Sequence, residues 1–151
     1  MGGRSLVFVS GLSIPQFVAV TGNDLLIGSF DGSGKYSVIG KYDGTSGATI
    51  NRFFISIQSG MEGMAATENH IYVSSESTRS IAVYDAKNGS TITEHLVPFS
   101  STGIAAEGDA LWLSEWVRFV GGQTDGNTFK VDGTSGTNAM GLGKDETISM
   151  R

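Results

Sequence analysis

The chain lacks cysteine altogether and has only 2 prolines among its 151 residues. The absence of cysteine excludes disulfide bonds and metal sites built on thiolates. Charged residues are also few, at 17%, and the 10 Lys and Arg residues form no run. The 15 Asp and Glu residues give a formal net charge of −5. We therefore expect no nucleic-acid partner, because binding to phosphates needs a basic face.

Long hydrophobic runs are missing too. No apolar stretch approaches the roughly 20 residues of a membrane-spanning helix, so we expect no membrane span. The opening MGGRSLVFVSG contains a four-residue apolar stretch. That stretch is too short for the hydrophobic core of a secretory signal peptide.

Glycine, in contrast, is abundant, with 22 residues, while apolar residues make up 39% of the chain. Many Gly, Ser and Thr residues with few charges are typical of a turn-rich all-β protein. A helical bundle would need more Ala, Leu, Glu and Lys. The length favours one domain covering residues 1–151, which is large enough to bury a core.

Similar turn sequences recur three times along the chain. The three stretches are KYDGTSGATINRFF from Lys41, VYDAKNGSTITEHL from Val83 and KVDGTSGTNAM from Lys130. An aspartate opens each turn and can accept hydrogen bonds from the backbone N–H groups that follow. A glycine closes each turn where a left-handed residue is needed. These residues are Asp43, Asp85 and Asp132, and Gly47, Gly89 and Gly136.

The sequence around these turns divides into three units, at about 13–57, 61–99 and 101–143. Each unit reads as strand, tight turn, strand, loop, strand, tight turn, strand. Four antiparallel strands in about 40–45 residues is the period of a β-propeller blade. A solenoid or a β-sandwich is the competing architecture, but a sandwich seldom repeats its turn chemistry at a fixed period. The sequence therefore predicts an all-β chain of three propeller blades.

The segment SLVFVSGL, at residues 5–12, precedes the first unit as RFFISIQSG precedes the second. We predict that it is an orphan outer strand from a blade whose other strands are missing. Three blades form an open arc, whereas propellers close with about four to eight blades. Either two chains close a six-bladed ring by self-association, or the chain is a fragment of a longer propeller.

The unit pattern resembles the bacterial secreted propellers of the NHL and YVTN kind. It is especially similar to tandem-repeat proteins that often carry a PEP-CTERM sorting tail. The resemblance lies in stretches such as GLSIPQFVAVTGNDLLIGSF and IGKYDGTSGATINRFF, and it covers about residues 5–140. It implies the propeller fold and an extracytoplasmic or secreted location. It implies little about activity, because such repeats occur in enzymes, scaffolds and binding modules.

Residues at the blade mouths would converge on the axis of a closed ring. We expect Gln16 and Thr102 to contribute to ligand binding there. Carboxylates at Glu62, Glu76 and Glu115 could hold a hard cation such as Ca²⁺, which prefers oxygen ligands. The competing interpretation is that these are loop carboxylates in water. The two histidines, His70 and His95, are expected to be solvated surface residues.

The third unit carries a long insert, EWVRFVGGQTDGN, at residues 115–127. Its Trp116, Arg118 and Phe119 are of the residue types enriched at binding hot spots. They would suit recognition of a carbohydrate or a peptide. The alternative is that the aromatic residues cover the open end of the third blade.

Two functions follow from these observations. The favoured one is a non-catalytic binding or assembly module without a cofactor, whose partners are a second copy of itself or a protein or carbohydrate ligand. The alternative is a propeller lyase or lactonase in which the axial carboxylates hold a divalent cation. An enzyme of that kind would respond to a chelator, whereas a scaffold would not.

Overall fold

A computed structural model describes residues 7–33, 35–75, 77–97, 101–115 and 128–133, together with the backbone of 138–142. The described residues contain twelve β-strands and no helix. The first four strands are β1 (Pro15–Thr21), β2 (Asp24–Phe30), β3 (Ser37–Asp43) and β4 (Thr49–Ile57). The next four are β5 (Gly63–Ala66), β6 (His70–Ser75), β7 (Ser80–Asp85) and β8 (Thr91–Leu96). The last four are β9 (Ser101–Glu107), β10 (Ala110–Glu115), β11 (Thr128–Asp132) and β12 (Asn138–Leu142).

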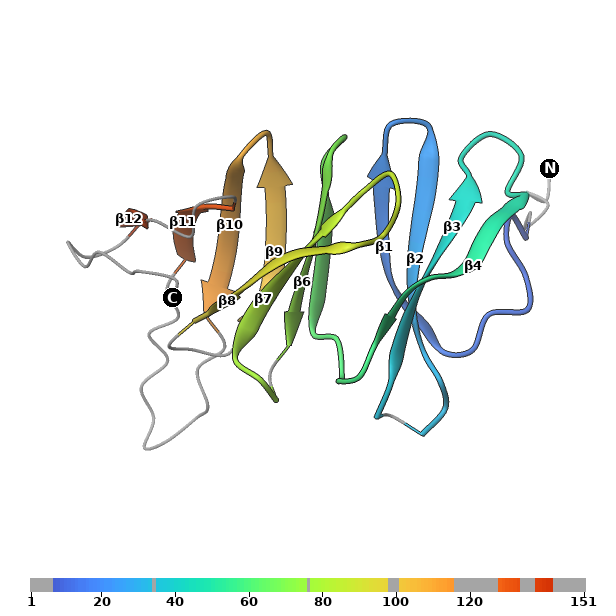
Figure 1. The fold of residues 1–151 in the computed structure, drawn as a ribbon, viewed down its shortest axis with the longest axis horizontal. Coiled ribbons are helices and arrows are strands. Elements are labelled where there is room, and N and C mark those ends of the chain that lie inside the picture. The colour runs from blue at the N-terminus through green and yellow to red at the C-terminus, as the bar shows by residue number, and fades with distance from the viewer. Residues whose placement is uncertain are drawn as a thin grey trace, which may run out of the picture.

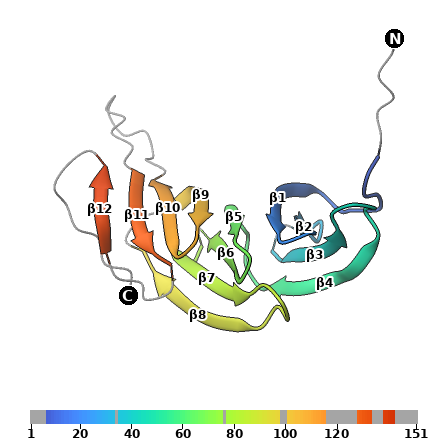
Figure 2. The ribbon, with the colours of Figure 1, turned by 90° about the horizontal axis from the view of Figure 1, so that it is seen from above.

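The strands form three separate antiparallel sheets, each with its four strands in chain order. The sheets lie side by side along an arc, with β1, β5 and β9 on the inner side and β4 and β8 on the outer side (Figures 1 and 2). The expectation of an all-β, propeller-like arrangement of four-stranded blades is confirmed. No helix in the described part of the chain is long and apolar enough to cross a membrane.

The predicted turn chemistry is present in the first two sheets. The Asp43 carboxylate accepts hydrogen bonds from the backbone N–H groups of Thr45 and Ser46 and from the Ser46 hydroxyl. These bonds, led by the one from the hydroxyl, hold the pKa of Asp43 below its usual value. Asp85 accepts from two backbone N–H groups in the same way, and its pKa is also lowered. Gly136 lies outside the described residues.

The closing glycines have the left-handed conformation that the sequence predicts. Gly47 has a φ of 72° and Gly89 a φ of 75°. Both also allow a close approach, because a Cβ on either would meet a carbonyl oxygen of another segment, that of Phe8 or that of Phe54. Each glycine is therefore required twice, once by its own turn and once by the neighbouring segment.

Two apolar clusters join the sheets. The first lies between the first and second sheets and is centred on fully buried residues such as Leu26, Ile39 and Ile71. The second lies between the second and third sheets and includes Tyr72 and Leu111. The middle sheet is thus covered on both faces, whereas in the part of the chain that the structure describes each end sheet has a neighbouring sheet on one face only.

Lys41 forms a contact between the first sheet and the second. Its Nζ donates to the backbone carbonyl of Ala86 at 3.0 Å and lies 3.1 Å from the Asp24 carboxylate. It also lies 4.9 Å from the centre of the Phe54 ring. A half-buried lysine with these contacts joins two sheets without leaving its charge unpaired.

The expected orphan strand at 5–12 is not formed over residues 7–12, which have no strand conformation. A strand needs a hydrogen-bonded neighbour, and β4 pairs only with β3 among the described strands. The segment nevertheless follows the first sheet, because the Phe8 carbonyl meets Gly47 as the Phe54 carbonyl meets Gly89. It takes the place of an outer strand from a preceding blade without the hydrogen bonds of a strand.

Two further expectations need correction. The almost wholly apolar stretch PQFVAV of β1 predicts a buried inner strand, but Val18 and Val20 are 65% and 60% exposed. Their face of β1 has no sheet packed against it in the described part of the chain. His95 was expected at the surface but is buried, with an exposed fraction of 9%. It lies on β8 opposite Ile81, whose side chain packs between the second and third sheets. Burial lowers the pKa of His95.

Candidate functional site

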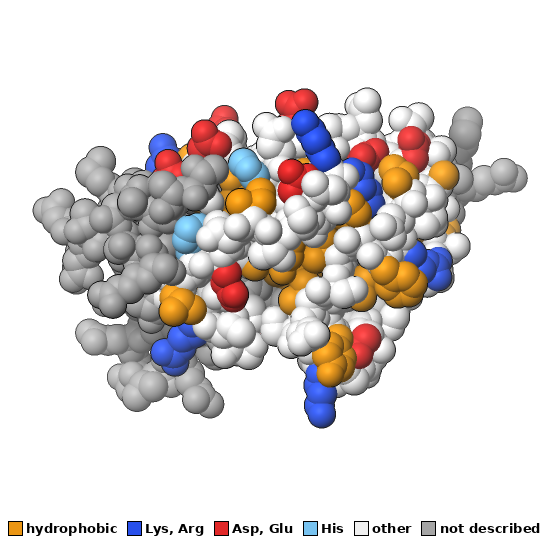
Figure 3. Space-filling view, in the orientation of Figure 1, with side chains coloured by type: hydrophobic (Ala, Val, Ile, Leu, Met, Phe, Trp, Pro, Cys, Tyr) orange, Lys and Arg blue, Asp and Glu red, His pale blue; other side chains and the backbone are white. Residues whose placement is uncertain are grey.

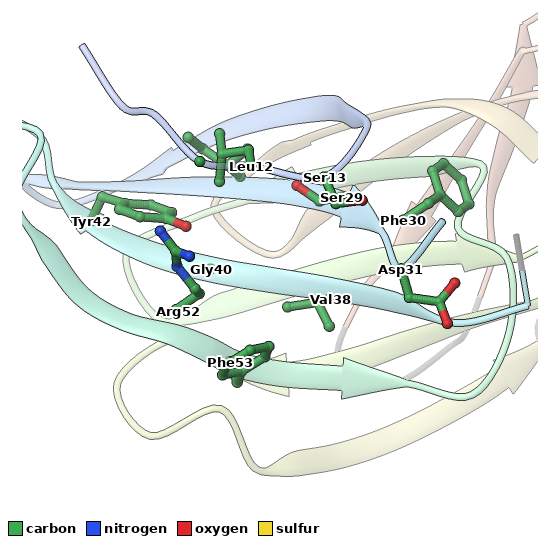
Figure 4. A pocket seen from close by; sticks show the side chains of 12 residues that line it. Leu12, Ser13, Ser29, Phe30, Asp31, Val38, Gly40, Tyr42, Arg52 and Phe53 are labelled. Atoms are coloured by element: carbon green, nitrogen blue, oxygen red, sulfur yellow. The ribbon is translucent and has the colours of Figure 1, made fainter. Parts of the chain in front are cut away.

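A cleft lies between the N-terminal segment and the first sheet (Figure 4). Its volume is about 310 Å³, at the lower end of the range for small-molecule sites. We call it the first cleft. Its lining residues are Gly11, Leu12, Ser13, Ile27, Ser29, Phe30, Asp31, Val38, Gly40, Tyr42, Arg52 and Phe53.

Tyr42 shapes one wall of the first cleft. Its ring lies over Gly40, so that a Cβ on Gly40 would be 2.6 Å from the Tyr42 hydroxyl oxygen. The ring is almost completely buried, with an exposed fraction of 1%. Glycine at position 40 therefore allows the aromatic ring to lie flat against the sheet and form an apolar wall.

The polar side chains that line the first cleft include those of Ser29, Arg52 and Asp31. The Ser29 hydroxyl is buried and has no hydrogen-bond partner among the described residues. The Arg52 guanidinium points toward the side of the cleft where Tyr42 lies (Figure 4), and it would lie 3.3 Å from a Cβ on Gly11. Asp31 is at the opposite side, where its carboxylate accepts from the Ser33 hydroxyl and backbone N–H. The first cleft thus has an apolar wall, one cation, one anion and one unsatisfied hydroxyl.

A second cleft lies between the end of β4 and the second sheet, with a volume of about 260 Å³. Its lining residues are Ser56, Ile57, Gln58, Ser59, Val73, Ser75, Thr78, Ser80, Ala82, Tyr84, Thr91 and Glu94. Apolar side chains gather between the first and second sheets near the middle of the face in Figure 3. Charged side chains of both signs are scattered over that face, without a large patch of one sign.

The two clefts occupy corresponding places in their sheets, as the alignment of the two turns shows. Ser29 corresponds to Ser75, Tyr42 to Tyr84 and Arg52 to Glu94. In the second cleft the Glu94 carboxylate accepts from the Ser80 hydroxyl, and Ser75 shares a hydrogen bond with Ser77. Desolvation, with a smaller contribution from Glu94, raises the pKa of Tyr84. The second cleft is therefore acidic and internally hydrogen-bonded, whereas the first carries an arginine and an unsatisfied serine.

The structure places some of the predicted mouth residues on the inner side of the arc. Gln16 on β1 and Thr102 on β9 are exposed. Glu62 is half-buried just before β5, and its backbone N–H donates to the Ser74 carbonyl. The backbone oxygen of Thr102 would be 3.0 Å from a Cβ on Gly63, so the second and third inner strands approach closely here.

The predicted metal site involves Glu115 as well, which is half-buried at the end of β10. The described residues contain no group of three or more His, Cys, Asp or Glu side chains placed to hold a metal ion. Glu76 lies outside the described residues, so the predicted trio remains a prediction. Trp116, Arg118 and Phe119 of the insert also lie outside the described residues.

The two ends of the arc are different surfaces. At the first sheet, Val18 and Val20 are exposed, while the corresponding Met64 and Ala66 of β5 pack against the first sheet. At the third sheet, Lys130 of β11 lies 4.9 Å from the centre of the Trp112 ring. Lys130 occupies the register of Lys41, the residue that reaches across to the next sheet.

Sequence reasoning did not identify the clefts. Their polar residues come from second, third and fourth strands, which the sequence indicated only as blade framework. One signal was present: the fourth strands read TINRFF and TITEHL, so a charge reversal from Arg52 to Glu94 interrupts two otherwise similar stretches. A reversal at matched positions points to surfaces with different partners.

No protein-family model matches the chain, and no curated protein matches its sequence. Solved structures with a similar fold include Kuenenia stuttgartiensis hydrazine synthase, with a TM-score of 0.61 and 17% identity over 99% of this chain. The computationally designed Ika8 protein matches with a TM-score of 0.58 and 15% identity over 89% of this chain. Regucalcin from Agrobacterium tumefaciens, a calcium-binding protein, matches with a TM-score of 0.50 and 22% identity over 68% of this chain.

The chain spans 38%, 39% and 38% of the Ika8, hydrazine synthase and regucalcin chains. At these identities the similarity establishes the fold, which is all-β and propeller-like.

Proposed function

We propose that the chain is a non-catalytic binding or assembly module that associates with a second copy of itself through the two ends of its arc. The exposure of Val18 and Val20 carries this proposal. At the matching positions of the second sheet, Met64 and Ala66 are packed against the neighbouring sheet. The resemblance of the repeated stretches to those of secreted NHL and YVTN propellers is the basis for proposing membership of that group and a location outside the cytoplasm.

A second copy is the favoured occupant because the two ends of the arc are complementary in kind. The second sheet packs against the first through the face that carries Met64 and Ala66. The open face of the first sheet carries Val18 and Val20 at the matching positions. The open face of the third sheet carries Lys130 in the register of Lys41, whose Nζ bonds the Ala86 carbonyl of the following sheet. The third sheet of one copy could therefore pack against the first sheet of another copy. The contact would be of the same kind as the one between the first and second sheets of a single chain.

Two such contacts close a ring around a two-fold axis. Head-to-tail interfaces close into a ring when their rotation permits it. Three sheets from each of two copies make a six-bladed ring, which is within the range of about four to eight blades for propellers. The inner strands of both copies would then surround one axis.

Light scattering across a dilution series tests this proposal. We expect the wild-type chain to have twice the mass of one chain. The double variant V18E/V20E should have the mass of a single chain, because the carboxylates would be buried unpaired in the interface. The matched control is I50E/I92E, which places the same charges at exposed isoleucines of β4 and β8 and should leave the mass unchanged. A wild-type chain of single mass at all concentrations would contradict self-association.

The second candidate is a lactonase or lyase with a divalent cation held by Glu62, Glu76 and Glu115. The observation that favours it is the similarity to regucalcin, whose description is that of a calcium-binding protein. Carboxylates are suitable ligands for Ca²⁺ because they supply hard oxygen donors. Glu62 lies just before the inner strand β5, and Glu115 ends the second strand β10 of the third sheet.

Thermal unfolding with and without CaCl2 tests the second candidate. A calcium site requires a rise in the unfolding temperature that saturates with calcium and is lost in E62Q/E115Q. The control is E68Q, at an exposed glutamate in the turn before β6. Equal unfolding temperatures with calcium and with EDTA would exclude the site, and hydrolysis of a lactone substrate would be measured only if calcium stabilises the chain.

A further inference from the structure

The first cleft is formed by residues of a single chain, on the face of the first sheet that a second copy would cover in the proposed ring, so the ligand and the second copy would compete for this face. Residues 11–13 of the N-terminal segment lie on one side, and β2, β3 and β4 lie on the other (Figure 4). Ile27, Val38 and the Tyr42 ring supply apolar surface. A compact apolar group can lose its contact with water by lying against them.

Ser29 is the first sign that this cleft is built for a ligand. Its residue is 8% exposed, and its hydroxyl has no hydrogen-bond partner among the described residues. A buried polar group without a partner is costly, and native proteins satisfy most such groups. The corresponding Ser75 in the second cleft has Ser77 as its partner. The absence of such a partner is therefore specific to the first cleft.

Arg52 is the second sign. Its planar guanidinium is suited to bind a carboxylate through two parallel hydrogen bonds. In the second cleft the corresponding residue is Glu94, which is already engaged by the Ser80 hydroxyl. The two clefts share their general form but present opposite charges to a ligand.

The positions of these groups define the ligand's length. In the ladder between β2 and β3, Ile27 pairs with Gly40 and Ser29 pairs with Val38. The Tyr42 hydroxyl lies over Gly40, on the side toward which Arg52 points. Gly40 and Val38 are two residues apart on one strand, a spacing of roughly 7 Å. A para-substituted benzene ring has about the length needed to join groups at these two positions.

We propose that the first cleft binds a small carboxylate with an apolar ring and a polar group at its far end. The carboxylate pairs with Arg52, the ring lies against Ile27, Val38 and Tyr42, and the far polar group receives a hydrogen bond from Ser29. The second cleft, with Glu94 in place of Arg52, does not take this ligand.

The test uses the ¹⁵N-labelled full chain and 4-hydroxybenzoate, followed by two-dimensional NMR. We expect saturable shifts at the backbone amides of residues 28–30, 40 and 52. The uncharged analogue 4-hydroxybenzamide should bind at least tenfold more weakly, because it cannot pair with Arg52. Shifts that do not saturate, or that spread over the surface without favouring these amides, would overturn the proposal.

Variants separate the roles of the two polar residues. R52Q should weaken binding of 4-hydroxybenzoate at least tenfold, and R52E should reverse the preference toward the cation 4-hydroxybenzylamine. The matched control is E94Q in the second cleft, which should leave binding of 4-hydroxybenzoate unchanged. Equal affinity of wild type and R52Q would refute the pairing with Arg52.

S29A provides a readout that does not depend on affinity alone. Removing an unsatisfied buried hydroxyl should leave the unfolding temperature of the free protein equal or higher, while binding weakens several-fold. A lower unfolding temperature in the free variant would mean that Ser29 already has a partner. That result would contradict its proposed role toward the ligand.

Discussion

The variant Y72A is expected to lower the free energy of unfolding by about 3–5 kcal/mol, the range for removal of a large buried aromatic side chain. Tyr72 is fully buried between the second and third sheets and belongs to the cluster that joins them. A Cβ on Gly133 would be 2.6 Å from its ring, so the third sheet lies directly against it. Unfolding by urea, followed by tryptophan fluorescence, measures the change.

Y72F is the control for this prediction. The Tyr72 hydroxyl is buried without a hydrogen-bond partner among the described residues. Burial, with the nearby carboxylates of Asp109 and then Asp132, raises the pKa of this phenol, so it stays protonated. Phenylalanine keeps the ring and removes the unsatisfied group, so Y72F should be as stable as wild type or slightly more stable. A loss in Y72F as large as that in Y72A would show that the hydroxyl, and not the ring, joins the sheets.

The variant G63V is expected to separate the second and third sheets and to lower the free energy of unfolding by about 1–3 kcal/mol, the usual range for overpacking. A Cβ at position 63 would lie 2.8 Å from the Ile104 Cγ2 and 3.0 Å from the Thr102 carbonyl oxygen. The carbonyl belongs to the backbone of β9, which can move away only by displacing the inner edge of the third sheet. Urea unfolding gives the loss, and hydrogen exchange at β9 should accelerate.

G22N is the matched control for G63V. Gly22 has a φ of 57° and has no atom within 4 Å of the place a Cβ would take. Asparagine tolerates this left-handed conformation better than other side chains, so stability should change little. If G22N destabilises as much as G63V, the loss in G63V is a general effect of replacing glycine and not a clash between sheets.

The sequence was sufficient to predict the strands because the turn chemistry is local. Asp43 and Asp85 bind the backbone of their own turns, and Gly47 and Gly89 close them, so the pattern can be read from neighbouring residues. The order of strands within each sheet follows from the same hairpins. The exposure of Val18 could not be predicted this way, since it depends on whether another sheet packs against the first.

The site was harder to predict than the fold because its parts come from distant residues. The first cleft brings together an N-terminal segment and three strands, and Gly40 matters there only because the Tyr42 ring lies over it. His95 appeared to be a surface residue because it lies on an outer strand. It is buried because the third sheet packs against that side of β8, which no local pattern indicates.

The close approach between the Phe8 carbonyl and Gly47 has a consequence for how such a chain could lengthen. The same contact, between the Phe54 carbonyl and Gly89, is made where one unit already passes into the next. The backbone at residue 8 thus lies where the end of a preceding unit would lie. Duplication of one unit upstream could be joined in frame without rerouting the backbone, and the added unit would meet a surface already shaped to receive it.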